Sequence, residues 1–405
     1  MRSINLRRVL IWVSVFSLAI IYIFNWVRML NDQQILFTTD FVPFYSAAQI
    51  SRNEGPSHIY DLELQKRYEE KIIGFSIPFE NINIFVNPPF VVPLVSLVIT
   101  PDLRISLVLW ELMMIMVFLI GNIFVFKLLY KEMPITELFI FLLGIILFFP
   151  FYKSLLFGQN SAILFLGASV WMYGLIRKKD GLAGLGLALM TIRPHIVLPL
   201  ALPFLFKRRS VFWWFLIGSA SLAAFSQVYS GLDGVLGFLK MITVSANGVN
   251  MTVNEKYMVN LMGFLIRIFP NMSLSVIHWA GWSAYIFNFV FLCTLWIRSS
   301  EIQGRQIGLA LLLTTFTTPH LHVHDLVLWI IPLVLILLSV KDNTLLINKY
   351  APLPLWFSMG FLACLFSPIL AEVIPFLILV ILIYLVYYST SKKIDSQAQQ
   401  EAGIT

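Results

Sequence analysis

The sequence predicts an all-α, polytopic membrane protein of about 10–13 transmembrane or re-entrant helices, with an outer-face loop that carries interfacial helices. Of its 405 residues, 59% are hydrophobic and only 12% are charged, whereas soluble domains carry roughly 25% charged residues. Long apolar runs alternate with short basic clusters, as is typical of a chain that crosses a membrane repeatedly. The net charge of +7 is spread over these clusters, so the sequence argues against nucleic-acid binding.

The apolar runs give the candidate membrane helices in chain order, since a span needs about 20 apolar residues or somewhat fewer where neighbours shelter it. Runs of this kind lie near residues 9–30, 105–129, 135–151, 160–177, 210–229, 272–297, 306–318, 324–340, 350–369 and 372–390. The basic start of the chain is similar to a signal peptide. However, the run from Val9 to Val27 is long enough to span and lacks a small-residue cleavage site, so we expect a retained helix. Cys293 and Cys364 lie inside such runs, and we interpret them as packed thiols.

The basic clusters predict the orientation of the chain, because cytoplasmic loops carry the excess of Lys and Arg. Clusters occur at Arg2, Arg7 and Arg8, in 127–131, 177–179, 207–209 and 298–305, at Lys341 and in the tail 391–405. One topology places all of them, and both termini, in the cytoplasm, and it places the loops 31–87 and 231–270 outside. We therefore expect a single multi-pass domain in the cell membrane, residues 1–390, followed by a cytoplasmic tail.

Two segments are too short or too interrupted to be ordinary spans. Residues 88–100 form a short apolar piece, which we expect to enter the membrane only partway. Residues 181–206 lie between two cytoplasmic clusters, so they must leave and return as two half-length helices of about 20 Å each. Arg193, in the interrupting stretch TIRPH, would be buried at the apex of this hairpin, where an arginine marks a functional site by default. The alternative is an arginine that extends to the outer surface.

The polar interruptions of the chain gather on the outer face in this topology. They are Asp40, Asp61, Asn87, Gln159, Asn160, Arg193, His195 and the three histidines of TTPHLHVHD, namely His320, His322 and His324. Asp40 directly follows the first helix, where a carboxylate can act as a general base towards a hydroxyl group. Arg193 and histidines can neutralise the negative charge of a departing phosphate. These residue types favour group transfer from a lipid phosphate outside the cytoplasm, and a transporter or flippase is the alternative.

Alternating histidines beside Asp325 also suggest a metal site, which needs three or four converging ligands. Pro319 and the apolar run after Asp325 predict a loop that turns into a helix start, so a metal would need a carboxylate from elsewhere, for which Asp40 is the only candidate. We therefore expect no metal and no cofactor. His322 and His324 would instead line a phosphate site at the helix entrance, where free backbone N–H groups favour anions. Asp325 would be a first-turn acid of that helix or would orient a histidine.

Several stretches, in their order along the chain, resemble glycosyltransferase family 87. They are TTDFVPFYSAAQISRNEGPSHIYD, NPPFVVPLVSL, GQNSAILFLGAS, GLAGLGLALMTIRPHIVLPLALPFLFKRR and TPHLHVHDLVLWIIPL. The resemblance covers about residues 36–340 and implies a GT-C type bundle that transfers a hexose, with mannose favoured, from a polyprenyl-phosphate sugar. A lipid or glycan acceptor would attack the anomeric carbon, and polyprenyl phosphate would leave.

The resemblance also implies residue roles. Asp40 matches the catalytic base, Tyr45 and Asp61 match positions on the acceptor side of the first loop, and Gln159 matches a GQ motif. Arg193 stands where the family more often has lysine before proline, and its planar fork suits phosphate oxygens. We expect the donor phosphate to bind at Arg193, His195, His322 and His324. We expect the acceptor or the sugar to bind at Tyr45, Asp61, Asn87, Gln159, Asn160 and His320.

Local structural roles are the alternatives at several of these positions. Asp40 would then be a helix-end carboxylate bonded to nearby amides, and Asp61 would be the N-cap of a surface helix. Gln159 or Asn160 would cap the helix that follows them, and Lys153 would extend to the membrane surface. A transporter would show paired broken helices in inverted repeats, whereas the sequence contains one such hairpin. The sequence does not indicate an oligomeric state.

Overall fold

The computed structural model describes residues 6–246, 255–299 and 302–401, and within these ranges the chain forms helices, turns and loops without a β-strand. Five helical segments there are long and apolar enough to cross a membrane: Leu6–Asn31, Leu103–Leu129, Ile135–Leu156, Arg209–Val244 and Leu274–Arg298. One face of the first segment stays exposed, with Phe16, Ile20 and Phe24 between 61% and 66% accessible. Such a face requires lipid as its solvent, so the predicted all-α membrane fold is confirmed.

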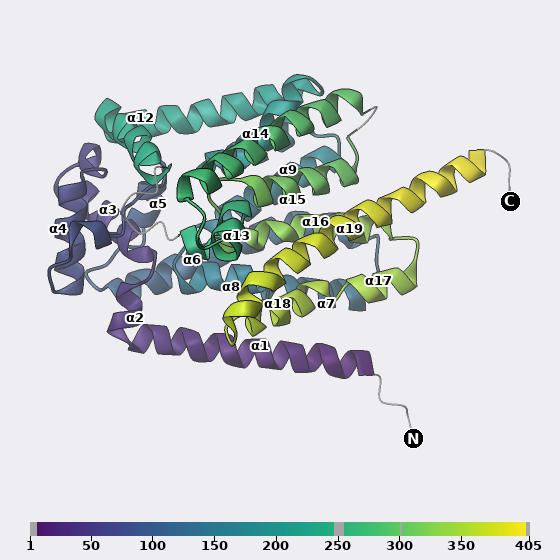
Figure 1. Ribbon diagram of the computed structural model, residues 1–405, viewed down its shortest axis with the longest axis horizontal. Coiled ribbons are helices and arrows are strands. Elements are labelled where there is room, and N and C mark those ends of the chain that lie inside the picture. Colours follow the sequence, from purple (N-terminus) through teal and green to yellow (C-terminus); the bar gives the residue numbers. More distant parts are fainter. Residues whose placement is uncertain (1–5, 247–254, 300–301, 402–405) are drawn as a thin grey trace.

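Figure 1 shows the long helices running in roughly the same direction, with the helices of the first loop grouped at one end. The elements, with η for 3₁₀-helices, are α1 (Leu6–Asn31), α2 (Gln33–Phe37), α3 (Phe41–Asn53), η1 (Pro56–His58), α4 (Leu62–Ile73), η2 (Phe79–Asn81), α5 (Val91–Ser96), α6 (Leu103–Leu129), α7 (Ile135–Ile146), α8 (Phe149–Leu156), α9 (Ser161–Ile176), α10 (Asp180–Leu189), η3 (Met190–Ile192), α11 (Pro194–Ala201), η4 (Leu202–Leu205), α12 (Arg209–Ala246), η5 (Glu255–Tyr257), α13 (Leu261–Ile268), α14 (Leu274–Arg298), α15 (Gly304–Thr317), η6 (Val323–Trp329), α16 (Ile330–Ser339), α17 (Thr344–Tyr350), α18 (Leu353–Ala363) and α19 (Pro368–Glu401).

Several predicted spans are interrupted in the structure. The run 135–151 forms α7 and the start of α8. Pro150 lies in the first turn of α8, where a backbone N–H would have no acceptor within the helix, so proline costs no hydrogen bond there. The run 324–340 begins as the 3₁₀-helix η6 and becomes α-helical at Ile330. The run 350–369 includes α18, which starts after Pro352. The run 135–151 still lies within a segment long enough to cross a membrane, Ile135–Leu156, whereas the apolar helix over 324–340, Val323–Ser339, is shorter.

The segment 181–206 folds back on itself. Asp180 at the start of α10 and Arg208 after η4 form an ion pair at 2.7 Å, so the two ends of the segment lie together. α10 packs closely against α9 because small residues line the contact: a Cβ on Gly186 would lie 2.4 Å from a backbone nitrogen of α9. The helix is interrupted at Arg193, with φ −127° and ψ 79°, because Pro194 disfavours the α conformation in the residue before it.

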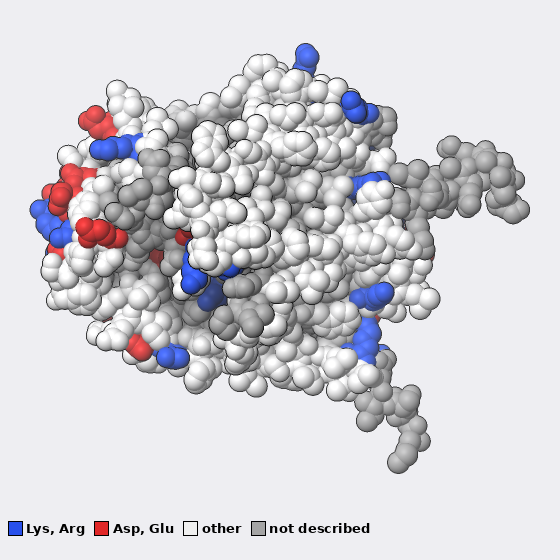
Figure 2. All heavy atoms as spheres, viewed as in Figure 1, with Lys and Arg blue, Asp and Glu red and all other residues white. Residues whose placement is uncertain are grey.

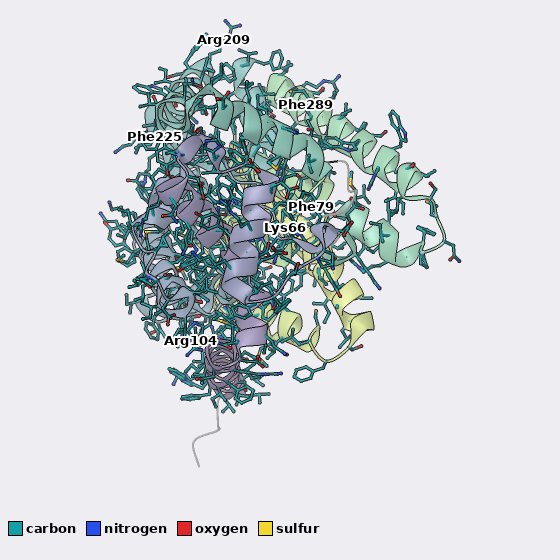
Figure 3. All side chains as sticks on the ribbon, turned by 90° about the vertical axis from the view of Figure 1, so that its left-hand side faces the viewer. Lys66, Phe79, Arg104, Arg209, Phe225 and Phe289 are labelled. Carbon is teal, nitrogen blue, oxygen red and sulfur yellow. The ribbon has the colours of Figure 1, made fainter. Side chains whose placement is uncertain are left out.

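The first loop forms one end of the molecule. α3 packs against α4 and α5, and Figure 3 looks onto this end, with Lys66 of α4 and Phe79 of η2 near the middle of the view. Asp and Glu atoms gather at this end, whereas the opposite end carries mostly Lys and Arg (Figure 2). The start of α1 and the end of α19 both lie towards that basic end (Figure 1).

The predicted second outer loop, 231–270, is partly helical. α12 continues through a kink at Gly231, whose φ of 70° is in the left-handed region, and α13 lies near the end of the loop. Some of the predicted regions lie outside the described residues, namely Arg2, 247–254, 300–301 and 402–405.

Candidate functional site

A cavity of about 1140 Å³ opens between the first loop and the helix bundle. One part of its wall is polar and carries Asp40, Asn87, Lys153, Gln159, Arg193, His195, His320, His322 and His324. Another part is apolar and carries Phe149, Phe157, Leu198, Met262, Trp282, Phe361, Leu365 and Pro375. The lining therefore combines charged and polar side chains with apolar ones, which suits an amphipathic ligand.

Asp40 lies immediately before α3, with its side chain in the cavity. Its Oδ2 accepts a hydrogen bond of 2.8 Å from Nε2 of Gln159, and its side chain does not cap α3. Asp40 is therefore a helix-end carboxylate whose amide partner is the side chain of Gln159 and not the backbone of α3. Burial raises the pKa of Asp40 above its usual value, and the hydrogen bond from Gln159 and the charges of His322, Arg193 and Lys153 oppose that rise.

The turn that presents Gln159 depends on the glycine before it. Gly158 has a φ of 68°, and a Cβ there would lie 2.6 Å from Cβ of Phe41. The carbonyl oxygen of Gly158 accepts a hydrogen bond of 2.9 Å from Nε1 of the fully buried Trp110. A side chain at this position is excluded both by the backbone conformation and by the contact with α3. The GQ pair thus brings the start of α9 against the start of α3.

Arg193 is held by side chains from three other parts of the chain. Its NH1 donates to Oδ1 of Asn87 at 3.0 Å, its NH2 donates to Oε1 of Gln159 at 3.1 Å, and its Nε lies 3.6 Å from Oδ2 of Asp325. Asp325 is fully buried and also accepts a hydrogen bond of 2.9 Å from Ser161. Arg193 does not extend to the outer surface, so that alternative is wrong.

The four histidines form a row of rings along the cavity. Ring centroids are 6.0 Å apart for His195 and His320, 4.8 Å apart for His320 and His322, and 5.7 Å apart for His322 and His324. The backbone at His322 is extended, and η6 begins at the next residue, as the predicted loop and helix start require. Burial lowers the pKa of His320 and of His322, so both rings are neutral near pH 7. Among the described residues, no grouping of three or more His, Cys, Asp or Glu is placed to hold a metal ion.

Asn160 supports the site from behind the wall. It is buried, and its Nδ2 donates to Oδ1 of Asn87 at 2.9 Å, which leaves that oxygen with two donors. Its side chain makes no capping bond to α9. The alternative role as a helix cap is therefore wrong, and Asn160 orients Asn87 towards Arg193.

Two residues that the family resemblance placed on the acceptor side lie away from the cavity. The hydroxyl group of the buried Tyr45 donates to the carbonyl oxygen of Thr100 at 2.7 Å, which ties α3 to the start of α6. Asp61 caps α4 by accepting from the backbone N–H groups of Glu63 and Leu64, as the local alternative predicts. Neither side chain lines the cavity, because each is already used to fix a helix end.

Two further residues emerge from the structure. Asp325 is the counter-ion of Arg193. Its Oδ2 also lies 3.7 Å from Nε2 of His324, which agrees with one of its two predicted roles, that of orienting a histidine. Lys153, for which the local alternative predicts a side chain that extends to the membrane surface, lines the cavity from α8 instead. The sequence offered one indication of this, because Lys153 lies on the helix that leads directly into the turn of Gln159.

Comparison with protein families gives one match. The model of glycosyltransferase family 87 matches residues 85–319, which is more than half of the chain. The matched range contains Asn87, Gln159, Arg193 and His195, begins after Asp40 and ends just before His320. No curated protein and no solved structure matches the chain.

Proposed function

Because the chain belongs to glycosyltransferase family 87, and so is a membrane glycosyltransferase, we propose that it transfers a hexose from a polyprenyl-phosphate sugar to a lipid or glycan acceptor. Mannose is the favoured sugar. The mixed polar and apolar lining of the cavity supports this proposal, since a polyprenyl-phosphate sugar has a polar head and a long apolar chain. The apolar wall would receive the first isoprene units, and the polar wall would receive the sugar and the phosphate.

Asp40 is the catalytic base in this proposal. Its carboxylate takes the proton from the acceptor hydroxyl group as the oxygen attacks the anomeric carbon of the sugar. The bond between that carbon and the phosphate oxygen breaks, and its electron pair leaves with polyprenyl phosphate. Attack from the side opposite the leaving group inverts the configuration at the anomeric carbon.

The hydrogen bond from Gln159 to Asp40 is the observation that carries the proposal. The oxygen and the nitrogen of a primary amide are similar in size, so the hydrogen-bond partners of the amide determine which of the two atoms faces the carboxylate. Arg193 determines the orientation of the Gln159 amide, because its NH2 donates to the amide oxygen and the amide nitrogen then faces Asp40. Asp40 therefore meets a donor, which favours its ionised form and hence its action as a base.

The donor phosphate is proposed to bind beside this pair. Arg193 has five N–H groups, of which two donate to amide oxygens, so N–H groups remain to reach phosphate oxygens. His195, His322 and His324 line the same wall and offer further donors. Asn87, Gln159 and His320 are proposed to contact the sugar or the acceptor, since all three face the cavity.

We place this chemistry on the extracytoplasmic side of the cell membrane, with both termini in the cytoplasm. The charge distribution supports that orientation, because mostly Lys and Arg lie at the end of the molecule where α1 starts (Figure 2). The site lies towards the other end, beside α3.

Replacement of Asp40 by Asn tests the proposal. The assay measures transfer of radiolabelled mannose from a polyprenyl-phosphate mannose in membranes that contain the full chain. We expect Asp40→Asn to lower the rate by about 100-fold or more, because general-base catalysis contributes roughly 10²–10⁴-fold. Asp102→Asn is the matched control, since Asp102 caps α6 from an exposed position and asparagine caps equally well. Transfer by Asp40→Asn at the wild-type rate would show that the assignment of the base is wrong.

A further inference from the structure

Lys153 is a positive charge on the polar wall of the cavity. It lies on α8, and its Nζ stands 4.2 Å from the centroid of the Phe157 ring, which lines the same cavity. Within the described part of the chain, no carboxylate forms an ion pair with it and no hydrogen-bond acceptor binds it. The ring stabilises the ammonium group by a cation–π contact, and the side chain lines the cavity, where a ligand can reach it.

Arg193, the other cation beside Asp40, differs from Lys153 in this respect. Its charge is compensated by the buried carboxylate of Asp325, whose Oδ2 lies 3.6 Å from Nε of Arg193. The pair together adds hydrogen-bond donors to the wall but little net charge. His320 and His322 are neutral because burial lowers their pKa values. Lys153 is thus a cation beside Asp40 whose charge is available to a ligand in the cavity.

The proposed reaction needs such a charge at a definite moment. A polyprenyl-phosphate sugar is a phosphodiester with one negative charge, and the departing phosphate monoester carries about −1.5 to −2. Before transfer, the negative charge of Asp40 faces Lys153, which is one of the charges that lower the pKa of Asp40. When Asp40 takes the acceptor proton, it becomes neutral, and the charge of Lys153 is no longer balanced by it.

We infer that Lys153 binds the phosphate of the donor and supplies the counter-charge for the departing polyprenyl phosphate. This inference rests on the proposed function and deepens it by assigning the charge to a residue of α8. Proton transfer to Asp40 and the gain of charge on the phosphate then occur together, so the total charge of the site stays constant through the step. α8 packs directly against η6, which places Lys153 on the same side of the cavity as His324.

Binding of a short lipid phosphate tests the inference without knowledge of the acceptor. The affinities of farnesyl phosphate and of farnesol are measured by calorimetry for the full chain in detergent micelles. Wild-type protein should bind farnesyl phosphate more tightly than farnesol. Lys153→Met should lose about tenfold or more of the affinity for the phosphate, as expected for a hydrogen bond to a charged group, while its affinity for farnesol stays unchanged. Lys153→Arg, which keeps the charge, should retain most of the preference.

Lys256→Met is the matched control. Lys256 also lines the cavity, from η5, but it is not among the charges that act on Asp40. Its variant should keep the full preference for the phosphate. If Lys153→Met does not fold, Lys153→Gln takes its place in the same measurement.

Three results would contradict the inference. Wild-type preference in both Lys153→Met and Lys153→Gln would overturn it and leave the proposed function standing. An equal loss in Lys256→Met would show a general effect of cavity charge and would also overturn it. If wild-type protein binds the two lipids equally, the proposed donor class itself is wrong, and the inference falls with it.

Discussion

Gln159 donates a hydrogen bond of 2.8 Å to Asp40, and the orientation of its amide is set by the guanidinium group of Arg193. The bond joins the turn before α9 to the start of α3, two parts of the chain that are far apart in the sequence. Through this bond Gln159 lowers the pKa of the proposed base and so favours its ionised form.

The pH dependence of transfer should reveal this control. Asp40 acts only when ionised, so the rate should fall as the pH is lowered through its pKa, which burial raises and Gln159 lowers. Gln159→Leu removes the lowering contribution, so the pKa of Asp40 rises and the acid limb of the kcat/KM profile moves to higher pH. Gln34→Leu, at an exposed position of α2, should leave the profile in place. An unchanged acid limb in Gln159→Leu would separate Gln159 from the ionisation of the base.

Gly158 provides a second prediction, about geometry. Gly158→Ala should lower transfer strongly, because the new Cβ would lie 2.6 Å from Phe41 and would push Gln159 away from Asp40. Gly74→Ala is the matched control: Gly74 has a similar positive φ of 82°, but nothing lies within 4 Å of its missing Cβ. That control should cost about 1 kcal/mol of stability and leave transfer unchanged. Equal activities of the two variants would count against the role of the turn.

The buried pair of Arg193 and Asp325 predicts a stability effect. Asp325→Ala leaves the charge of Arg193 uncompensated, so we expect it to lower the free energy of unfolding by about 3–5 kcal/mol. Ser161→Ala removes one hydrogen bond to the same carboxylate and should cost about 1.5 kcal/mol. Unfolding in mixed detergent micelles measures both. The double variant Arg193→Met, Asp325→Leu should be more stable than Asp325→Ala, and the reverse order would refute the charge argument.

Chelation separates a metal role of the histidines from a phosphate role. Treatment with a chelator should leave transfer unchanged, while His322→Ala should raise the KM for the donor about tenfold through the loss of a charge-assisted hydrogen bond. His58→Ala, at an exposed position on η1, is the control. Loss of activity on chelation, with recovery on adding a divalent ion, would support the metal instead.

Cysteine labelling tests the orientation. In a variant without Cys293 and Cys364, Glu63→Cys on α4 should react with a membrane-impermeant maleimide in intact cells. Lys349→Cys on α17 should react only after the cells are opened. Both positions are exposed, and they lie at opposite ends of the molecule. The opposite labelling pattern would invert the proposed topology.

The sequence predicted those site residues that stand out from their neighbours as polar or charged residues within or beside an apolar segment. Arg193 was predictable because an arginine interrupts a segment bounded by basic clusters, and Asp40 because a carboxylate lies in the stretch that follows the first apolar run, although α2 separates it from α1. Each of these charged residues departs from the apolar pattern around it, so it can be recognised without knowledge of its partners in the fold. The all-α membrane fold was predictable for the same reason, since composition alone determines it.

The pairings between these residues could not be predicted. Asp325 was read as a first-turn acid or as a partner of a histidine, because a sequence pattern shows helix starts and near neighbours but not a partner from a distant hairpin. The structure joins it to Arg193. Tyr45 and Asp61 came from family resemblance, and both serve local helix ends instead. Lys153 has the same sequence context as a lysine that reaches the membrane surface, and only the position of the cavity distinguishes the two.

The buried ion pair also has a consequence for the synthesis of the protein. Arg193 leaves the ribosome well before Asp325 does, and at about 5–20 residues per second the delay is on the order of ten seconds. During that time the growing chain has to shelter a guanidinium group whose counter-ion does not yet exist. Chains that stop before η6 would keep that charge without its counter-ion and would therefore be less stable than the full chain.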